Sequence, residues 1–345
     1  TTNILQRMRE LSIQSANDSN SDGDRANIQK EVAQLQSEIN RIAEQTSFNG
    51  KNILDGSFTT AKFHVGAFAD QSISVSIGSA KATDIGNYAA VSSVNMGTAT
   101  ATGDATLDNG VGAAAGIQIS GSLGSQTVAG VAGETASSYA AKVNAASSAT
   151  GVSADASTSF KIDYGADVVN GETLSFNLSS RDSSEAVIGS EAAISIVVSD
   201  TNSYTTLRDA INSVSASTGI TAELATGGLT LTNANGDDVA ITDATNGTVL
   251  DDALDVTTDI AAFALGGAVT TDSTLVSGQV SFSSSRAFTI SGAAGTEIMD
   301  AASTSGTLSS VASLSVATQT GANSALKVID QALSFISDTR ADLGA

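Results

Sequence analysis

The sequence predicts a multidomain α+β protein, with an α-helical rod built from both ends of the chain and β-rich outer domains built from its middle. Two observations predict the rod. A heptad-spaced apolar stripe lies near each end of the 345 residues, and such a stripe forms a helix seam that requires a partner helix. A third observation predicts the outer domains, because residues 91–305 are rich in Ala, Ser, Thr and Gly and contain short runs of alternating β-branched residues.

Two helices are expected at the start of the chain. Residues 1–17 form the first, because Ile4, Met8 and Leu11 recur at helical spacing and most charged residues lie off this stripe. Asn, Asp and Ser residues then interrupt the pattern, since their side chains compete for backbone hydrogen bonds. Ser21, with Asp24 three residues later, predicts the N-cap of a helix that runs to about Glu44. The seam of this second helix consists of Ile28, Val32, Leu35, Ile39 and Ile42.

The end of the chain carries the same rhythm, with Arg340 at the one position that the apolar stripe skips. Two seams at opposite ends of one chain are natural partners, so we expect these two helices to pack against each other. The predicted rod domain therefore comprises residues 1–90 and 306–345. The C-terminal seam consists of Leu326, Ile329, Leu333, Ile336 and Leu343.

The apolar period changes to two after Phe58. Residues 63–67 and 73–77 each alternate apolar with other residues, and Asp70 and Gln71 separate the two runs. This pattern predicts a β-hairpin attached to the rod.

An internal repeat lies within residues 91–305. The pattern Tyr139-x3-Val143-Asn144-x6-Gly151 aligns without gaps with Leu207-x3-Ile211-Asn212-x6-Gly219, and Thr precedes the Gly in both copies. We interpret the copies as related α+β modules at about residues 110–180 and 185–245, each with a strand, a short helix, a Gly turn and a second strand. Chance similarity in a chain rich in Ser, Thr and Ala is the alternative. The repeat gives no template for residues 246–305.

The charge distribution narrows the possible partners. The net charge is −21, and residues 91–310 hold 5 Lys and Arg against 23 Asp and Glu, a net −18. Such a surface repels nucleic acid, and only 4% of the residues are aromatic.

No apolar run approaches the roughly 20 residues that a membrane-spanning helix needs, so no membrane insertion is expected. The chain contains no Cys, which excludes disulfides and thiolate metal sites.

No catalytic, cofactor or metal site is expected. His64 is the single histidine, and its place in the alternating pattern indicates a surface side chain. A Ser/His/Asp arrangement cannot be assembled with confidence around it. The acidic segments at residues 233–238 and 251–255 lack the ligand spacing of an EF-hand, and the first also has the composition of a hairpin turn. The sequence therefore predicts a protein without enzymatic activity.

The N-terminal residues carry a family resemblance. Residues 6–17 (Gln-Arg-Met-Arg-Glu-Leu-Ser-Ile-Gln-Ser-Ala-Asn) and 48–56 (Phe-Asn-Gly-Lys-Asn-Ile-Leu-Asp-Gly) resemble the N-terminal region of bacterial flagellins. Residues 325–345 resemble the flagellin C-terminal helix, and the repeated module is similar to a small insert motif of many flagellins. The resemblance covers roughly 90 N-terminal and 40 C-terminal residues. It implies a structural subunit of the flagellar filament, with its terminal helices in the filament wall and a variable, surface-exposed middle.

Further expectations follow from this resemblance. Flagellins polymerise with other flagellin subunits, work with an export chaperone and a filament cap, and leave the cell through the flagellar secretion channel without a cleaved signal peptide. We therefore expect an extracellular location in the bacterial flagellum. The outermost terminal helices of the family are missing from the residues that match, so the chain is expected to be a trimmed fragment that polymerises poorly.

The resemblance also predicts partner-binding residues. Arg7, Leu11 and Glu31 match flagellin positions that contact Toll-like receptor 5 in flagellins that activate it. An Arg beside an exposed Leu and a nearby Glu would form a compact mixed patch of the kind found at binding hot spots. Packing between filament subunits is the alternative role for the same surface. The predicted contact residues are Gln6, Arg7, Arg9, Glu10, Leu11 and Glu31.

Two other functions remain open within the same lineage. A hook-associated junction protein would share the terminal helices, so the fold alone does not exclude it. A surface adhesin would need aromatic platforms for sugars, but Tyr88, Tyr139, Tyr164 and Tyr204 are scattered singly along the sequence. The uninterrupted segments at residues 6–11 and 48–50 favour flagellin itself.

Overall fold

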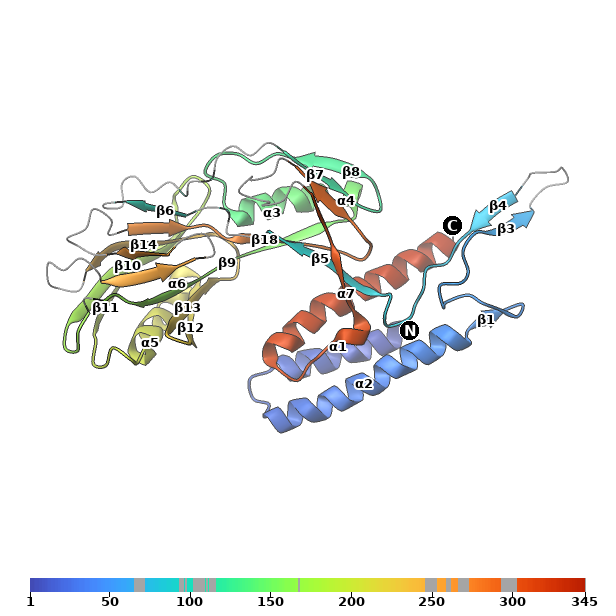
Figure 1. Cartoon of the computed structure of the whole chain (residues 1–345), viewed down its shortest axis with the longest axis horizontal. Helices are drawn as coiled ribbons and strands as arrows, with labels where there is room; N and C mark the ends of the chain where they lie inside the picture. The colour runs from blue at the N-terminus through green and yellow to red at the C-terminus, as the bar shows by residue number, and fades with distance from the viewer. Residues whose placement is uncertain are drawn as a thin grey trace. The chain divides into compact units, whose positions relative to one another are not determined.

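The computed structural model describes residues 1–64, 72–92, 96, 98–101, 109, 111, 116–166, 168–245, 253–258, 262–265, 273–292 and 303–344. The chain divides into two compact units (Figure 1). The helical unit comprises Thr1–Ala89, Ser284–Ala287 and Gly306–Ala345, and the β-rich unit comprises Ala90–Ser283 and Phe288–Ser305. The chain is therefore a multidomain α+β protein, as the sequence predicts.

The helical unit combines long helices with short antiparallel strand pairs. Its helices are α1 (Thr2–Ala16), α2 (Asp22–Gln45), the 3-10 helix η1 (Val311–Ser313) and α7 (Gln319–Gly344). Its strands are β1 (Ser47–Phe48), β2 (Lys51–Asn52), β3 (Ala61–His64), β4 (Ser72–Val75), β5 (Gly86–Val91) and β21 (Thr307–Ser310). Strands β1 and β2, β3 and β4, and β5 and β21 form pairs. The β3–β4 pair is the predicted hairpin, although residues 65–71 of that pattern lie outside the described residues.

The turn between α1 and α2 is built by residues on both sides of it. Ser21 and Asp24 form the predicted capping box: the Asp24 N–H donates to Ser21 Oγ at 3.2 Å, and the Ser21 N–H donates to Asp24 Oδ2 at 3.1 Å. The buried Arg25 guanidinium donates to the carbonyl oxygens of Ser15, Asn17 and Asn20 at 2.8–3.1 Å. The capping signal was visible in the sequence, whereas the role of Arg25 was not.

The packing of the helices differs from the expected pairing of two seams. Helix α1 packs along α7 and also contacts α2, and Figure 1 shows the three helices side by side. Among the described residues, α2 and α7 do not pack closely along each other. The prediction that the seams of α2 and α7 meet directly is therefore wrong. Helix α1 lies between them because Leu5, Met8 and Leu11 give it a continuous buried face.

The buried face of α7 is made mostly of small residues. Of the predicted C-terminal seam, Ile329 is buried, Leu326, Leu333 and Ile336 are only partly buried, and Leu343 is half exposed. Small side chains on α7 accommodate the large side chains of α1, which explains why the stripe of large residues lies to one side of the contact. The buried residues of α7 are Ala322, Ala325, Val328, Ile329 and Ala332.

Residues 82–85 and 311–316, instead of α7, cover the seam of α2. Its residues Ile28, Val32 and Ile39 are buried in one cluster with Ala82, Ile85, Val311, Leu314 and Val316. Three amide side chains of α2 hold these segments. Gln36 Nε2 donates to the Val311 carbonyl at 2.8 Å, Gln29 Oε1 accepts from the Val316 N–H at 2.6 Å, and Asn40 Oδ1 accepts from the Ala82 N–H at 2.9 Å. The heptad pattern predicts burial here, but the partner consists of the turn at residues 81–84, the 3-10 helix η1 and the residues that follow each of them.

The β-rich unit contains several antiparallel sheets (Figure 1). One follows the order β11-β10-β14-β17-β6, another β20-β19-β7-β8, and a third contains β12, β13, β9 and β18 in this order, with β15 paired to β9 and β16. The strands are β6 (Thr98–Ala101), β7 (Ile117–Ser120), β8 (Ser125–Val128), β9 (Ser153–Tyr164), β10 (Thr173–Arg181), β11 (Val187–Val197), β12 (Ile220–Ala225), β13 (Gly228–Asn233), β14 (Asp238–Thr245), β15 (Leu254–Thr257), β16 (Ala262–Leu265), β17 (Ser273–Val276), β18 (Gln279–Ser284), β19 (Thr289–Ser291) and β20 (Ser303–Ser305).

The two copies of the internal repeat have the same order of elements. The first copy has α3 (Ala136–Ala145), α4 (Ser147–Thr150) and β9, and the second has α5 (Thr205–Ser213), α6 (Ser215–Thr218) and β12. Gly151 and Gly219 both adopt the left-handed conformation, with φ of 75° and 73°. A strand precedes the helices in each copy, β8 in the first and β11 in the second.

The repeated Asn joins helix to strand identically in both copies. Asn144 donates through Nδ2 to the Ala154 carbonyl and accepts through Oδ1 from the Ala154 N–H, each at 2.8 Å. Asn212 makes the same two bonds with Ala222, at 2.9 and 2.8 Å. In each copy, the Asn of the hydrophobic–Asn pair thus makes the two backbone hydrogen bonds that a neighbouring strand would otherwise make.

A buried carboxyl group lies inside the β-rich unit. Asp238, the first residue of β14, is 1% exposed, and its Oδ2 accepts a hydrogen bond from Asn109 Nδ2 at 2.7 Å. Its Oδ1 has no hydrogen-bond partner among the described residues. Burial raises the pKa of Asp238 to about 7, against the effects of the Ser277 hydroxyl and of the Asn109 amide, which favour the ionised form.

Replacement of either Asn144 or Asn212 should destabilise the β-rich unit by a similar amount. Asn144→Ala and Asn212→Ala each remove two hydrogen bonds and leave partly buried backbone groups unpaired, so we expect losses of about 1–3 kcal/mol. Chemical denaturation of the full chain, followed by circular dichroism, measures the change. Asn235→Ala is the control, because Asn235 is exposed and its side chain makes no hydrogen bond among the described residues. Unchanged denaturation midpoints for both Asn144→Ala and Asn212→Ala would show that these side chains do not stabilise the unit.

The buried carboxyl group should make stability depend on pH. A carboxyl group whose folded pKa is raised favours the folded state below its unfolded value near 3.8, and this contribution is lost as pH rises through about 7. We expect Asp238→Asn to remove this fall and to be more stable than wild type at pH 8, by roughly 4 kcal/mol at most. Thermal denaturation of both proteins between about pH 5 and 8 tests the difference. Parallel curves for the two proteins would show that Asp238 is not the group responsible.

Candidate partner-binding surface

The outer face of α1 carries a network of charged side chains. Arg7 Nε donates to Glu31 Oε1 on α2 at 3.0 Å, and Arg7 Nη1 donates to Glu10 Oε2 at 3.1 Å. The hydrogen bonds that Arg7 donates to Glu31 and to Glu10 raise the pKa of its guanidinium, which therefore remains charged. All three side chains are exposed, so water and salt screen these ion pairs and they contribute little to stability. Their charged atoms remain accessible to a partner.

A second ion pair joins α1 to α7. Arg9 Nε donates to Asp330 Oδ1 at 2.7 Å, and both side chains are exposed. Gln6, another predicted contact residue, is also exposed. The structure therefore brings Gln6, Arg7, Arg9, Glu10 and Glu31 to the surface of one unit.

Leu11 does not belong to this surface. It is only 2% exposed and packs in the core of the helical unit with Leu5 and Met8. The prediction of an exposed leucine beside Arg7 is wrong, because the helical period places Leu11 on the same buried stripe as Met8. Any effect of Leu11 on a partner would act through the position of α1.

Ile13 is the exposed apolar residue of α1 that the sequence reasoning missed. It is 50% exposed and follows Arg9 and Glu10 by one helical turn, so these side chains share a face. Its position off the Ile4, Met8 and Leu11 stripe was the signal that could have identified it. The face thus combines charged groups with one apolar side chain.

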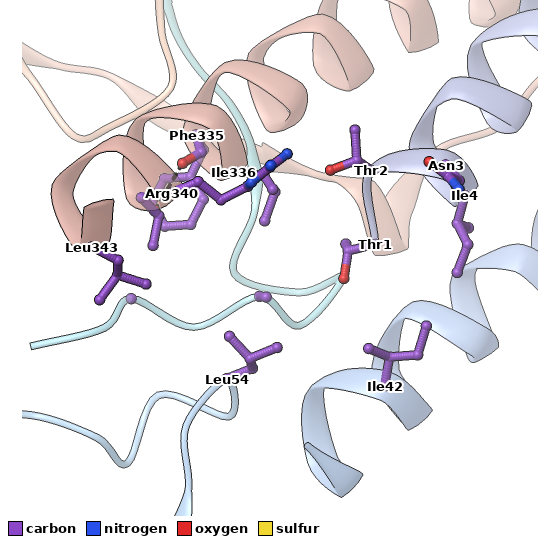
Figure 2. A pocket seen from close by; sticks show the side chains of 13 residues that line it. Thr1, Thr2, Asn3, Ile4, Ile42, Leu54, Phe335, Ile336, Arg340 and Leu343 are labelled. Carbon is purple, nitrogen blue, oxygen red and sulfur yellow. Dashed lines mark hydrogen bonds between the residues drawn. The ribbon is translucent and has the colours of Figure 1, made fainter. Parts of the chain in front are cut away.

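An open groove lies elsewhere on the helical unit. Its volume is about 620 Å³, and its wall includes the start of α1, the end of α2, the end of α7 and residues 54 and 78–80. Figure 2 shows Ile42, Leu54 and Leu343 around this space, with Arg340 at the end of α7. The guanidinium of Arg286 lies 5.2 Å from the ring centre of Phe335, another wall residue, and pairs with Asp342 at 3.5 Å. Apolar side chains exposed together in this way are typical of interaction sites.

The groove accounts for three residues of the predicted helix seams. Ile42 and Ile336 are partly buried and line the groove with Leu343. Ile336 also packs against the core of the helical unit, whereas Leu343 is 50% exposed. The assignment of Leu343 to an intramolecular seam is therefore wrong, and its side chain contributes apolar surface to the groove.

Among the described residues, no group of three or more His, Cys, Asp and Glu side chains could hold a metal ion. His64 ends β3 opposite Ser72, and its side chain is not among those that the structure describes. Residues 233–238 form a turn, in which Asn233 Oδ1 accepts from the Asn235 N–H at 2.9 Å. This turn joins strands of two different sheets, so the expectation of a hairpin there is wrong.

Comparison with known families identifies two segments. The bacterial flagellin N-terminal helical region matches residues 1–59, which include α1 and α2. The flagellin hook IN motif matches residues 173–235, which contain the second copy of the internal repeat.

No helix in the described part of the chain is long and apolar enough to cross a membrane.

Individual relatives extend the match to the whole chain. B-type flagellin of Pseudomonas aeruginosa is 37% identical over 358 residues, which cover 100% of this chain and 69% of that protein. Flagellin D of Vibrio anguillarum is 56% identical over 77 residues, which cover 22% of this chain and 20% of that protein. Among solved structures, FliC from Burkholderia pseudomallei has a TM-score of 0.36 and 21% sequence identity, and the match covers 99% of this chain and 92% of that chain.

The chain belongs to the bacterial flagellin family. This follows from the identity along its full length together with the two family segments. Members of the family are structural subunits of the flagellar filament, which lies outside the cell, and they polymerise with other flagellin subunits.

Proposed function

We propose that this chain is a structural subunit of the bacterial flagellar filament and that copies of it assemble through the helical unit. The observation that carries the proposal is the common core formed by both ends of the chain, in which α1 contacts α2 and α7. The same unit exposes a groove and a charged face. An assembly subunit needs a rigid unit with exposed contact residues, and these features support that role.

The residues of the two surfaces suggest different roles in assembly. The groove offers the apolar side chains of Leu54, Phe335 and Leu343, whose burial would supply contact energy at about 25 cal/mol per Å². The charged side chains of Arg7, Glu10 and Glu31 would determine which partner surface fits, because charge complementarity acts mainly on specificity. We propose that residues 91–305 form the outer domains and that residues 1–90 and 306–345 form the assembling rod.

The remaining partners are proposals from family membership. We infer that the chain is exported through the flagellar secretion channel without a cleaved signal peptide, with the help of an export chaperone, and that a filament cap directs its assembly. We also propose that it has no catalytic role.

A hook-associated junction protein is the main alternative. It would use related terminal helices but would occupy only the junction between hook and filament. A surface adhesin is the other alternative, and it would depend on binding by the β-rich unit.

Immunogold electron microscopy separates the filament subunit from the junction protein. A peptide tag inserted between Ser183 and Ser184, in the exposed turn that joins β10 to β11, should leave both strands paired. We expect gold along the whole filament of bacteria whose complete flagellin carries the tag in this turn, because each subunit would carry one tag. Bacteria with the untagged chain are the control. Gold confined to the base of the filament would favour the junction protein, and unlabelled filaments would contradict both.

We further propose that the charged face of α1 and α2 is recognised by Toll-like receptor 5. The residues involved are Gln6, Arg7, Arg9, Glu10 and Glu31, with Leu11 holding α1 in place from the core. An exposed Arg between two carboxylates offers a fixed guanidinium to a partner, and Arg is enriched among binding hot spots.

Reporter cells that express the receptor test this second proposal. Arg7→Ala and Arg9→Ala remove exposed side chains, so the fold should persist while the half-maximal concentration rises about tenfold or more. Arg41→Ala is the matched control, because Arg41 is an exposed arginine of α2 that pairs with Glu38 outside this face. Wild-type potency in both face variants would exclude the proposed contact. Leu11→Ala is unsuitable, because a cavity in the core would destabilise α1.

A further inference from the structure

Two tyrosines that are distant in sequence form a stacked pair in the β-rich unit. The rings of Tyr164, at the end of β9, and Tyr204, just before α5, lie 4.7 Å apart between centres, at 18° between planes. These two tyrosines stand singly in the sequence, and the fold brings them together. Both rings are partly buried and pack against the hydrophobic core of the unit. The stack provides a fixed aromatic surface at the edge of that core.

A pocket opens beside this pair. It has a volume of about 370 Å³ and lies between the loop that precedes α5 and the turn that joins β12 to β13. Tyr204 and the polar residues Thr201, Asn202 and Ser203 line one side, and Leu224 lines the other. Leu224 is 51% exposed, so the wall of the pocket includes an exposed apolar side chain as well as Tyr204.

The loop that forms the pocket is held in place from behind. The Tyr164 hydroxyl donates to the Ser203 carbonyl at 3.3 Å, and the Thr201 N–H donates to Asn170 Oδ1 at 2.9 Å. Within the loop, the Ser203 N–H donates to the Asp200 carbonyl at 3.0 Å. A ligand would therefore meet a formed site and would not have to order the loop, which lowers the cost of binding.

The internal repeat shows that the module does not require a tyrosine at this position. In the gap-free alignment, Tyr204 corresponds to Ala136 in the first copy. There Thr135 caps the helix by accepting a hydrogen bond from the Ser138 N–H at 3.1 Å, whereas Tyr204 makes no capping hydrogen bond. The first copy folds with a small residue and a proper cap. The aromatic ring in the second copy is therefore an addition to the module.

The chemistry of the lining determines the class of ligand. The pocket is lined by hydroxyl and amide groups, one aromatic ring and one exposed leucine, and no charged side chain contributes to it. The neighbouring Lys161, close to Gly227, is paired with Asp163 at 2.9 Å. A ligand with an apolar C–H face and several hydroxyl groups fits both parts of the lining, since the face can cover Tyr204 while the hydroxyls bond to polar side chains. We propose that this pocket binds one neutral pyranose unit of a saccharide.

Saturation-transfer difference NMR on the full chain tests the site directly. The probes are methyl β-glucopyranoside, methyl β-galactopyranoside and N-acetylglucosamine, each titrated to about 10 mM because a shallow site of this size should bind in the millimolar range. We expect saturable transfer to the ring C–H protons of at least one probe. In Tyr204→Ala and Leu224→Ser, the dissociation constant should rise about tenfold or more.

The variants are chosen to separate binding from folding. Leu224→Ser changes an exposed side chain and should preserve the fold, so it remains informative if Tyr204→Ala loosens the core. Leu123→Ser is the matched control, because Leu123 is an exposed leucine of the β-rich unit that does not line the pocket. Lack of saturable transfer for all three probes would overturn the proposal. Equal binding by wild type and Leu224→Ser, or binding of N-acetylneuraminic acid alone, would also overturn it.

Discussion

Burial of α1 against both α2 and α7 is the interaction on which the helical unit depends. It joins residues 301 positions apart in sequence, as in the 2.6 Å hydrogen bond from Ser15 Oγ to the Val316 carbonyl. The large residues Leu5 and Met8 of α1 contribute to the same cluster as the alanines of α7. Because small side chains face large ones, the helices approach closely without leaving cavities. A chain whose ends are fixed in this way can carry a long insertion, since extra loop length costs little entropy once the ends are held.

The same packing explains why the stripe of large apolar residues on α7 is less buried than the small residues of that helix. Once α1 occupies the space beside α7, the larger residues Leu326, Leu333 and Ile336 lie at the margin of the contact and Leu343 remains half exposed. The apolar side chains left over from the intramolecular core line the groove with Leu54 and Ile42. In a protein that assembles with copies of itself, such residual apolar surface serves contacts between subunits.

The β-rich unit contains the same helix, Gly turn and strand arrangement twice, and the two copies differ at the residue before the helix. In each copy an Asn side chain joins a helix to the following strand and a Gly in the left-handed conformation turns the chain between them. These features are independent of what surrounds the module. The residues before each helix differ, with the capping Thr135 in one copy and Tyr204 in the other. A repeated framework with one altered edge is a simple way to add a binding surface without disturbing the core.

The sequence by itself determined the features that depend on neighbouring residues. The capping box at Ser21, the bounds of the first two helices, the strand pair after Phe58 and the equivalence of Asn144 with Asn212 follow from spacings of a few residues, and the structure has each of them. The tertiary structure alone decided which helix lies between which and that Tyr164 stacks on Tyr204. A heptad seam predicts only that a helix packs against a partner. The position of an isolated aromatic residue in the sequence does not predict which residues lie beside it in space. Those outcomes depend on the relative sizes and positions of side chains from distant segments, which a local pattern does not contain.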